Sequence, residues 1–309
     1  MTLKNRDIVN IVDLELDEIY RILKVAREMV PAAKGEERSK LLEGKVLASL
    51  FFEASTRTRL SFETAMLRLG GDVITIAGQE GTSLMKGETL ADTIRMADGY
   101  SDVIALRHPR EGAARMSATF ARSPIINGGD GAGQHPTQTL LDLFTIKEDL
   151  GDISRQHITI TGDLRYGRTT HSLALALGRL GASMSFVAPK IIQMPDHIIE
   201  DLREMGVEVE KTSSLQAVIP NSDVVYMTRI QKERFAEEEE YRKISGGFKL
   251  NMKMLKDAKE NMIIMHPLPR VDEIDPEIDS TKHARYFIQA FNGVPVRMAL
   301  LKLVLEGEQ

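Results

Sequence analysis

Short apolar segments alternate with helical patterns along almost the whole chain, and this alternation restricts the fold more than any other feature. In the first half, strand-type segments occupy 45–52, 72–77, 102–107 and 124–127, with helical patterns near 57–69, 88–98 and 111–121. In the second half, strand-type segments occupy 156–161, 182–187, 207–210, 223–228 and 262–265. Strands joined through helices pair in parallel and form buried sheets. We therefore expect an α/β protein with two doubly wound parallel-sheet domains and an active-site cleft between them.

The glycine-rich segment 128–133 is the strongest break in this pattern. A helical pattern from Pro136 to Leu150 follows it, with the proline at a position suited to a first helical turn. We therefore expect one domain over residues 1–134 and a second domain over residues 135–293.

Both ends of the chain also carry helical patterns. Apolar residues at helical spacing predict an amphipathic helix over about residues 13–30. The apolar pattern over 284–305 is interrupted at 292–295, where an asparagine, a glycine and a proline occur together. This interruption predicts two helices with an elbow, of which the last, 294–309, is expected to pack back on the first domain.

The composition limits the classes of function that the chain can have. A hydrophobic fraction of 42% with 28% charged residues is typical of a soluble globular protein. The net charge of −5 argues against general binding of nucleic acid or of anionic membranes. Cysteine is absent, which excludes disulfides, a thiolate nucleophile and a cysteine-based zinc site. No apolar run approaches the roughly 20 residues of a membrane span, and no secretion signal opens the chain, so we expect a cytoplasmic protein.

Ser55, Thr56, Arg57 and Thr58 lie where a predicted strand is followed by a predicted helix. The first turn of a helix exposes unpaired N–H groups and the positive end of the helix dipole, which favour an anion. Three hydroxyls and a planar guanidinium within four residues suit a phosphate group. The alternative is that the hydroxyls only cap the helix. No G-x-x-x-x-G-K-[ST] motif is present, so we predict a small phosphate rather than a nucleoside triphosphate. We call these four residues the phosphate cradle.

Charged and polar residues follow several other predicted strands. Arg107 and Arg168 come after two of them, and Arg229 with Gln231 after a third. Ligands of open α/β sheets bind at the carboxyl ends of strands, so these residues should gather at one site. Arg168, Arg229 and Gln231 suit carboxylates, because a guanidinium can bind a carboxylate through two hydrogen bonds.

His135 and Gln138 open the helical pattern that follows the glycine-rich segment. The positive end of a helix disfavours imidazolium, so His135 is suited to donate as a neutral imidazole to a carbonyl oxygen on which negative charge develops. A purely structural histidine is the alternative. Ser83 and Lys86 lie in a glycine-flanked loop that suits a lid over an anionic substrate, although a plain surface loop would look the same.

These residues include no nucleophile, no metal-ligand cluster and no cofactor motif. The site is therefore expected to bind two anions and to stabilise charge, without a metal or a cofactor. The attacking nucleophile would then belong to the second substrate.

Three motifs give the chain a specific family resemblance. Phe52-Glu53-Ala54-Ser55-Thr56-Arg57-Thr58-Arg59 resembles the carbamoyl-phosphate signature of the aspartate and ornithine carbamoyltransferases. His135-Pro136-Thr137-Gln138-Thr139-Leu140-Leu141-Asp142 and His266-Pro267-Leu268-Pro269-Arg270 extend the resemblance in the family's order. The similarity runs from about residue 5 to residue 305.

The resemblance implies a role for each candidate residue. The phosphate cradle would hold the phosphate of carbamoyl phosphate, while Thr58, Arg107 and His135 would polarise its carbonyl oxygen. The carbamoyl amine would be bound by Gln138 and by the backbone carbonyls of Leu268 and Pro269. Arg168, Arg229 and Gln231 would hold the two carboxylates of L-aspartate.

The resemblance also implies a homotrimer with shared active sites, in which Ser83 and Lys86 come from the neighbouring subunit. The loop has one residue fewer between Ser83 and Gly87 than the family's pattern, which leaves the reach of Ser83 open. The expected reaction carbamoylates the amine of L-aspartate, as in pyrimidine biosynthesis. Regulatory chains, allosteric effectors and assembly beyond a trimer are left open by the sequence.

Two alternatives to an enzyme that acts on aspartate remain. Ornithine carries a cationic side chain, which Arg229 would repel, and the ornithine-specific members commonly have His-Cys-Leu-Pro where this chain has His266-Pro267-Leu268-Pro269. A non-catalytic assembly subunit would keep the fold and lack turnover. Against it, no arginine or histidine of the expected set is missing.

Overall fold

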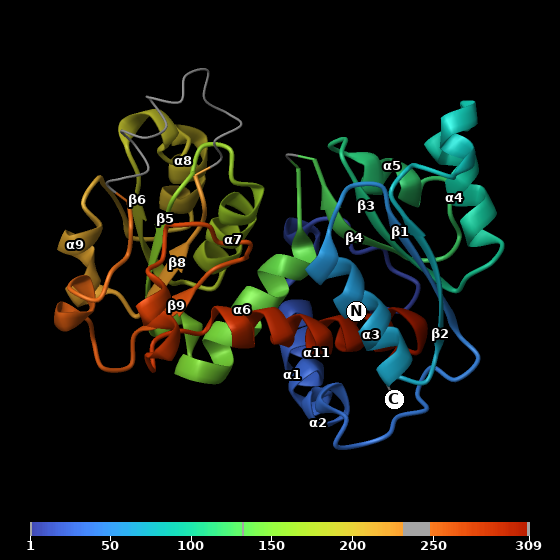
Figure 1. Cartoon of the computed structure of the whole chain (residues 1–309), viewed down its shortest axis with the longest axis horizontal. Coiled ribbons are helices and arrows are strands. Elements are labelled where there is room, and N and C mark those ends of the chain that lie inside the picture. The colour runs from blue at the N-terminus through green and yellow to red at the C-terminus, as the bar shows by residue number, and fades with distance from the viewer. Residues whose placement is uncertain (1, 132, 231–247, 308–309) are drawn as a thin grey trace. The chain divides into compact units, whose positions relative to one another are not determined.

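The computed structural model describes residues 2–131, 133–230 and 248–307, and the chain divides into two compact units (Figure 1). Unit 1 comprises Met1–Phe144 and Phe291–Gln309, and unit 2 comprises Thr145–Ala290. The two divisions fall within helices α6 (Pro136–Leu150) and α11 (Tyr286–Leu305). The sequence placed the domain boundary at residue 134, before α6, because a glycine-rich segment is a stronger local signal than a division inside a continuous helix.

Unit 1 contains a four-stranded parallel sheet with strand order β2-β1-β3-β4. Its strands are β1 (Val46–Phe51), β2 (Asp72–Ala77), β3 (Val103–His108) and β4 (Ile125–Asp130). Its shorter helices are α1 (Leu16–Glu28), α2 (Val30–Lys34), α3 (Thr56–Arg68), α4 (Leu90–Asp98) and α5 (Ala113–Ala118). The chain goes from β1 outward to β2 and then returns to the other side of β1, which is the doubly wound order.

Helices cover both faces of this sheet. Since successive residues of a strand point to opposite sides, each face has its own set of side chains that pack against helices. One face packs with α4 and α5 in a single buried cluster that includes Ala48, Leu50, Ile104, Leu106, Ile94, Ala97 and Ala114. On the opposite face, Ser49 of β1 donates a hydrogen bond of 3.0 Å to Glu63 of α3.

Unit 2 contains a five-stranded parallel sheet with strand order β7-β6-β5-β8-β9. Its strands are β5 (His157–Thr161), β6 (Ser183–Val187), β7 (Val209–Thr212), β8 (Val224–Met227) and β9 (Ile263–Met265). Its described α-helices include α7 (Arg168–Arg179), α8 (Asp196–Glu204) and α9 (Leu215–Val218). The prediction of two parallel sheets with flanking helices is therefore confirmed.

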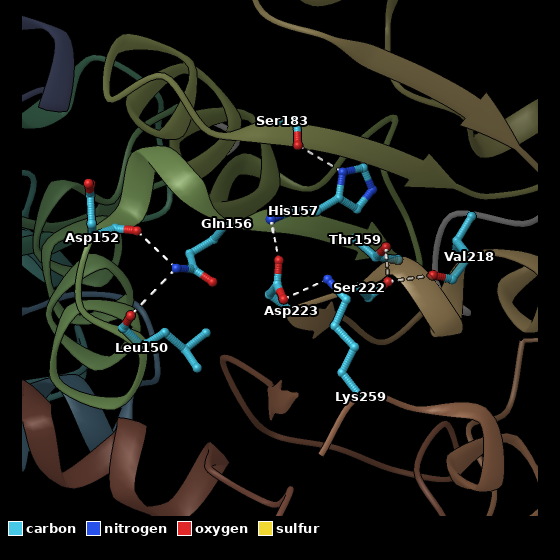
Figure 2. Close-up of polar contacts among 10 residues, drawn as sticks. All are labelled: Leu150, Asp152, Gln156, His157, Thr159, Ser183, Val218, Ser222, Asp223 and Lys259. Carbon is cyan, nitrogen blue, oxygen red and sulfur yellow. Dashed lines mark hydrogen bonds and ion pairs between the residues drawn. The ribbon is translucent and has the colours of Figure 1, made fainter. Parts of the chain in front are cut away.

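The two units fasten the amino ends of their central strands in the same way. In unit 1, Asp102 accepts hydrogen bonds from the backbone N–H of Val46 (2.9 Å) and from Lys45 Nζ (3.0 Å). In unit 2, Asp223 accepts from the backbone N–H of His157 (2.8 Å) and from Lys259 Nζ (2.7 Å) (Figure 2). Each carboxylate satisfies a strand-end N–H group and is neutralised by a lysine. The polar residues at this edge therefore have a structural role, and the opposite, carboxyl edge is left for ligands.

Three local expectations are corrected by the structure and one is confirmed. Strand β4 continues through the first glycines of the 128–133 segment as far as Asp130. The helix expected over about 13–30 is confirmed as α1, and a further short helix, α2, follows it with Pro31 near its start. The helix expected near 111–121 is only the six residues of α5. Strand β2, expected to be buried, lies at the edge of its sheet and is largely exposed.

The C-terminal segment is also different from the expectation, because α11 is one continuous helix. Pro295 lies inside this helix rather than at an elbow between two helices. By length and composition alone α11 could cross a membrane. However, 78% of its most apolar stretch of 18 residues is buried in the structure, which is typical of a core helix. From Phe291 onward the helix belongs to unit 1.

Candidate active site

The phosphate cradle lies where β1 ends and α3 begins. Ser55 is the N-cap residue of α3 and has an extended backbone, but its side chain makes no capping hydrogen bond. The structure therefore does not support the alternative that the Ser55 hydroxyl only caps the helix. Thr58 lies in the first turn and is buried, with 8% exposure. Thr56 and Arg57 are exposed beside it, and partial burial lowers the pKa of the Arg57 guanidinium.

Arg107 lies near the carboxyl end of the neighbouring strand, β3. Its Nη1 donates to the carbonyl of Gly128 (3.0 Å), and its Nε lies 3.2 Å from the Glu53 carboxylate. The register of β3 and β4 shifts here, so Gly128 and Gly129 together lie opposite Arg107. Such a bulge turns the local backbone and re-aims a side chain, and Gly129 takes the positive φ (115°) that it requires. The guanidinium is thereby held at the carboxyl end of its strand.

These two groups lie on either side of the point where the strand order reverses. The chain leaves β1 toward β2 and returns to β3 on the other side of β1, so the loops after β1 and β3 diverge. Open α/β sheets bind ligands at this kind of position. The cradle, which follows β1, and Arg107, near the end of β3, therefore lie at the two strand ends that the topology of unit 1 favours.

His135 is buried, with 4% exposure, and directly precedes Pro136, the first residue of α6. Gln138 lies in the first turn of the same helix and donates from Nε2 to Asp142 Oδ1 (2.9 Å). This bond fixes the orientation of the amide and directs its oxygen away from the carboxylate. An oxygen held in this way can accept a hydrogen bond from an amine of a ligand.

Asp130 fixes the turn that leads to His135, and sequence reasoning did not identify it. Its Oδ1 accepts from the backbone N–H of Gln134 (2.7 Å) and its Oδ2 from that of Gly112 (2.8 Å). The Asn127 amide also donates to Asp130 Oδ1 (3.1 Å). The available signal was an aspartate among the glycines just before the histidine, in a segment that was interpreted only as a break.

The candidate residues of unit 2 also follow strands at its point of reversal, between β5 and β8. Arg168 is the first residue of α7, after β5, and Arg229 follows β8 by two residues. The loops after these strands approach closely at Gly162, which has a φ of 118°. A Cβ on Gly162 would lie 2.2 Å from the carbonyl oxygen of Thr228, so only glycine fits here. This contact sets the spacing of the two loops that carry the arginines.

Leu268 and Pro269 follow β9, the neighbour of β8. Their loop is fixed by His266, whose Nδ1 accepts from the backbone N–H of Leu268 (2.8 Å). Since Nδ1 accepts, Nε2 carries the proton and donates to Glu273 (2.7 Å), inside the protein. Leu268 has a φ of 55°, a left-handed conformation that is rare outside glycine, and the Leu268–Pro269 peptide is cis. The turn that carries these two backbone carbonyls is thus fixed through the Leu268 N–H by the buried His266 side chain.

The remaining predicted residues are placed less closely by the structure. Ser83 and Lys86 are exposed at the two ends of a short 3-10 helix, η2 (Ser83–Lys86), whose Leu84 packs against the core of unit 1. Their expected reach into a neighbouring subunit stays a prediction. Gln231 lies outside the described residues. In residues 2–131, 133–230 and 248–307, no group of three or more His, Asp or Glu side chains could hold a metal ion.

Comparison with known proteins decides the family. The model of the aspartate/ornithine carbamoyltransferase carbamoyl-phosphate binding domain matches residues 6–148. The model of the aspartate/ornithine binding domain of the same enzymes matches residues 154–304. The chain belongs to the aspartate/ornithine carbamoyltransferase family. The resemblance inferred from the three motifs is therefore confirmed over nearly the whole chain.

Among curated members of the family, the chain is similar to aspartate carbamoyltransferase catalytic subunits. That of Thermococcus kodakarensis is 54% identical over 99% of this chain and 98% of its own length. That of Archaeoglobus fulgidus is 55% identical over 97% of this chain and 99% of its own length.

Solved structures of aspartate transcarbamoylases have the same fold. The catalytic subunit from M. jannaschii has a TM-score of 0.91 at 50% identity, covering 96% of this chain and 97% of its own. The enzyme from Trypanosoma cruzi in complex with carbamoyl aspartate and phosphate has a TM-score of 0.92 at 41% identity, covering 98% and 97%.

Proposed function

We propose that this chain transfers the carbamoyl group of carbamoyl phosphate to the amine of L-aspartate, giving N-carbamoyl-L-aspartate and phosphate. The main support for the proposal is the position of two sets of basic residues, one in each unit, at the point where the strand order of its sheet reverses. The cradle and Arg107 in unit 1 suit a phosphate and a carbonyl, and Arg168 with Arg229 in unit 2 suits two carboxylates. The aspartate transcarbamoylase of T. cruzi has been solved in complex with carbamoyl phosphate and aspartate, and with carbamoyl aspartate and phosphate, which supports this choice of substrates.

The chemistry follows from the side chains of unit 1. The deprotonated amine of aspartate attacks the carbonyl carbon, and negative charge builds on the carbonyl oxygen as the C–N bond forms. Thr58, Arg107 and His135 stabilise this oxyanion by donating hydrogen bonds to it. The C–O bond to phosphate then breaks, the attacking nitrogen gives its extra proton to the departing phosphate, and phosphate leaves into the cradle at the N-terminus of α3.

Holding both substrates in place contributes a large share of the rate, because a two-body reaction becomes effectively a one-body reaction. Arg168, Arg229 and Gln231 bind the carboxylates of aspartate and direct its amine. Gln138 and the carbonyls of Leu268 and Pro269 bind the carbamoyl amine and orient its plane. Since Arg229 repels a second cation, aspartate is preferred over ornithine.

The test is incubation of the purified chain with carbamoyl phosphate and either L-aspartate or L-ornithine, followed by identification of the product by mass. We expect N-carbamoyl-L-aspartate from the first mixture and no carbamoylated product from the second. Product from neither amino acid would overturn the proposal. Citrulline as the main product would identify an ornithine-specific member of the family instead.

We further propose that the active form is a homotrimer, in which Ser83 and Lys86 of each chain complete the site of a neighbour. The exposure of both residues on η2 leaves them accessible to another chain, and anchoring of Leu84 gives the segment a defined position. Regulatory chains are a further possible partner of such a trimer.

Subunit mixing tests the shared site. Arg57→Ala chains and Lys86→Ala chains should each be inactive, because each site lacks one of the two cations. Mixed trimers contain interfaces where an intact Arg57 meets an intact Lys86, so activity should return after mixing. Absence of recovery, once mass spectrometry has verified subunit exchange, would argue against a site built across chains.

A further inference from the structure

Helix α11 carries a buried guanidinium that the proposed chemistry does not use. Arg297 is only 2% exposed and lies in the part of α11 that belongs to unit 1. Removing an ion from water is costly unless its contacts compensate. The position of this cation therefore requires an explanation.

Arg297 contacts both helices that begin at the candidate site of unit 1. Its Nη2 donates to Thr137 Oγ1 (3.1 Å), in the first turn of α6 between His135 and Gln138. Its guanidinium carbon lies 4.9 Å from the ring centroid of Phe62, on α3, which is a cation–π contact. One side chain thus touches the helix that carries the cradle and the helix that carries the histidine.

The surrounding residues make room for the guanidinium. Gly293 lies one helical turn before Arg297, and a Cβ there would be 2.2 Å from Arg297 Nη1. A glycine inside a helix costs roughly 0.5–1 kcal/mol relative to alanine. Its presence in α11 is explained if the guanidinium must lie against α6 at this point.

The charge of Arg297 is coupled to site residues. Burial is the main cause that lowers the pKa of Arg297, to about 9, and the positive charge of Arg107 lowers it further. The carboxylate of Asp142 acts in the opposite direction. Asp142 also accepts the hydrogen bond from Gln138. The same carboxylate therefore raises the pKa of Arg297 and orients the amide of Gln138, a candidate substrate-binding residue.

We propose that Arg297 is a positioning residue, which holds the first turn of α6 against α3 so that His135 and Gln138 meet a carbamoyl group bound at the cradle. The inference rests on the proposed function and extends it to a residue that does not touch substrate. It assigns the Arg297–Thr137 hydrogen bond the task of aligning His135 and Gln138. The aspartate-binding residues belong to unit 2, so Arg297 should act on turnover and leave aspartate affinity unchanged.

Two substitutions test this proposal. Arg297→Met keeps the length of the side chain and removes the charge, and Thr137→Val keeps the shape of Thr137 and removes the acceptor. We expect Thr137→Val to lower kcat about tenfold, the rate equivalent of one hydrogen bond to a charged group, and Arg297→Met to lower it at least as much. KM for aspartate should stay close to the wild-type value in both. Lys302→Met removes a charge from the same helix and serves as the matched control with unchanged kcat.

The double variant separates positioning from stability. If the two residues act through one bond, Arg297→Met with Thr137→Val should lower kcat no further than Arg297→Met alone. Thermal unfolding should show that Thr137→Val keeps its fold at the assay temperature. An active wild type whose folded Thr137→Val variant retains full kcat would overturn this inference alone. A wild type without carbamoyl transfer would overturn the proposed function, and this inference with it.

Discussion

Arg107 illustrates how single residues are prepared for the reaction. Its guanidinium is held by Glu53 and by the Gly128 carbonyl at a strand bulge, before any substrate binds. A donor held in place stabilises a developing oxyanion without reorganisation during the reaction. Such pre-positioning suits a site that stabilises charge and supplies no nucleophile of its own.

Replacement of Arg107 by alanine should therefore reduce turnover strongly without unfolding the protein. Loss of one oxyanion donor typically costs about 2.7–4 kcal/mol, or roughly 10²–10³ in kcat. Steady-state kinetics with carbamoyl phosphate and aspartate measure the loss, and circular dichroism checks the fold. Arg110→Ala removes an exposed arginine from the loop that follows β3 and should keep near wild-type turnover. Near wild-type turnover of Arg107→Ala would refute the role.

At this scale the sequence identified the candidate ligand-binding residues and missed residues that support them. Ser55 to Thr58, Arg107 and His135 were identified because hydroxyls, arginine and histidine at strand or helix ends are unusual in a simple structural role. Asp130 and Arg297 were missed, since each acts through tertiary contacts that local spacing does not reveal.

At the scale of elements, the loop after β9 depends on the buried pair of His266 and Glu273. Burial raises the pKa of the Glu273 carboxyl, but hydrogen bonds from His266 and from backbone N–H groups, that of Val271 among them, outweigh it. The pKa of Glu273 is therefore lowered in the folded state. A carboxylate with a lowered pKa adds stability above its unfolded-state pKa and loses it as the pH falls through the folded-state pKa.

The free energy of unfolding should accordingly fall below about pH 4.3, the ordinary pKa of glutamate, and fall less in Glu273→Gln, which cannot be protonated. Urea unfolding at a series of pH values from neutral downward measures both slopes. Glu277→Gln, at an exposed position, is the control for the loss of one carboxylate. Parallel slopes for the wild type and Glu273→Gln would show that the pair does not contribute to the acid sensitivity.

The elements themselves were predictable where the periodicity was strong. The strands of both sheets were located to within a few residues, because short apolar segments between helices have few other solutions. The elbow predicted near Pro295 was wrong, since local helix-breaking signals were overridden by burial of the apolar helix α11. Tertiary packing of this kind has no signature in a local window.

At the scale of the whole molecule, the chain carries a net charge of −5 and yet is proposed to bind two anionic substrates. The cradle, Arg107, Arg168 and Arg229 concentrate positive charge at the carboxyl edges of the sheets. Local potential, not net charge, then determines which ligands bind. The sequence predicted two domains but placed their boundary ten residues or so early, because the units divide inside helices.

The central claim is that unit 1 binds the phosphate part and unit 2 the aspartate part of one reaction. Calorimetric titration of wild type, Arg57→Ala and Arg168→Ala with inorganic phosphate and with N-(phosphonacetyl)-L-aspartate tests it most directly. Each lost charged hydrogen bond should weaken binding by about 1.5–3 kcal/mol, or roughly 10- to 150-fold. We expect Arg57→Ala to weaken binding of both ligands and Arg168→Ala to weaken only that of the bisubstrate analogue. Equal weakening of phosphate binding by both variants, or unchanged binding of the analogue by either, would contradict the account.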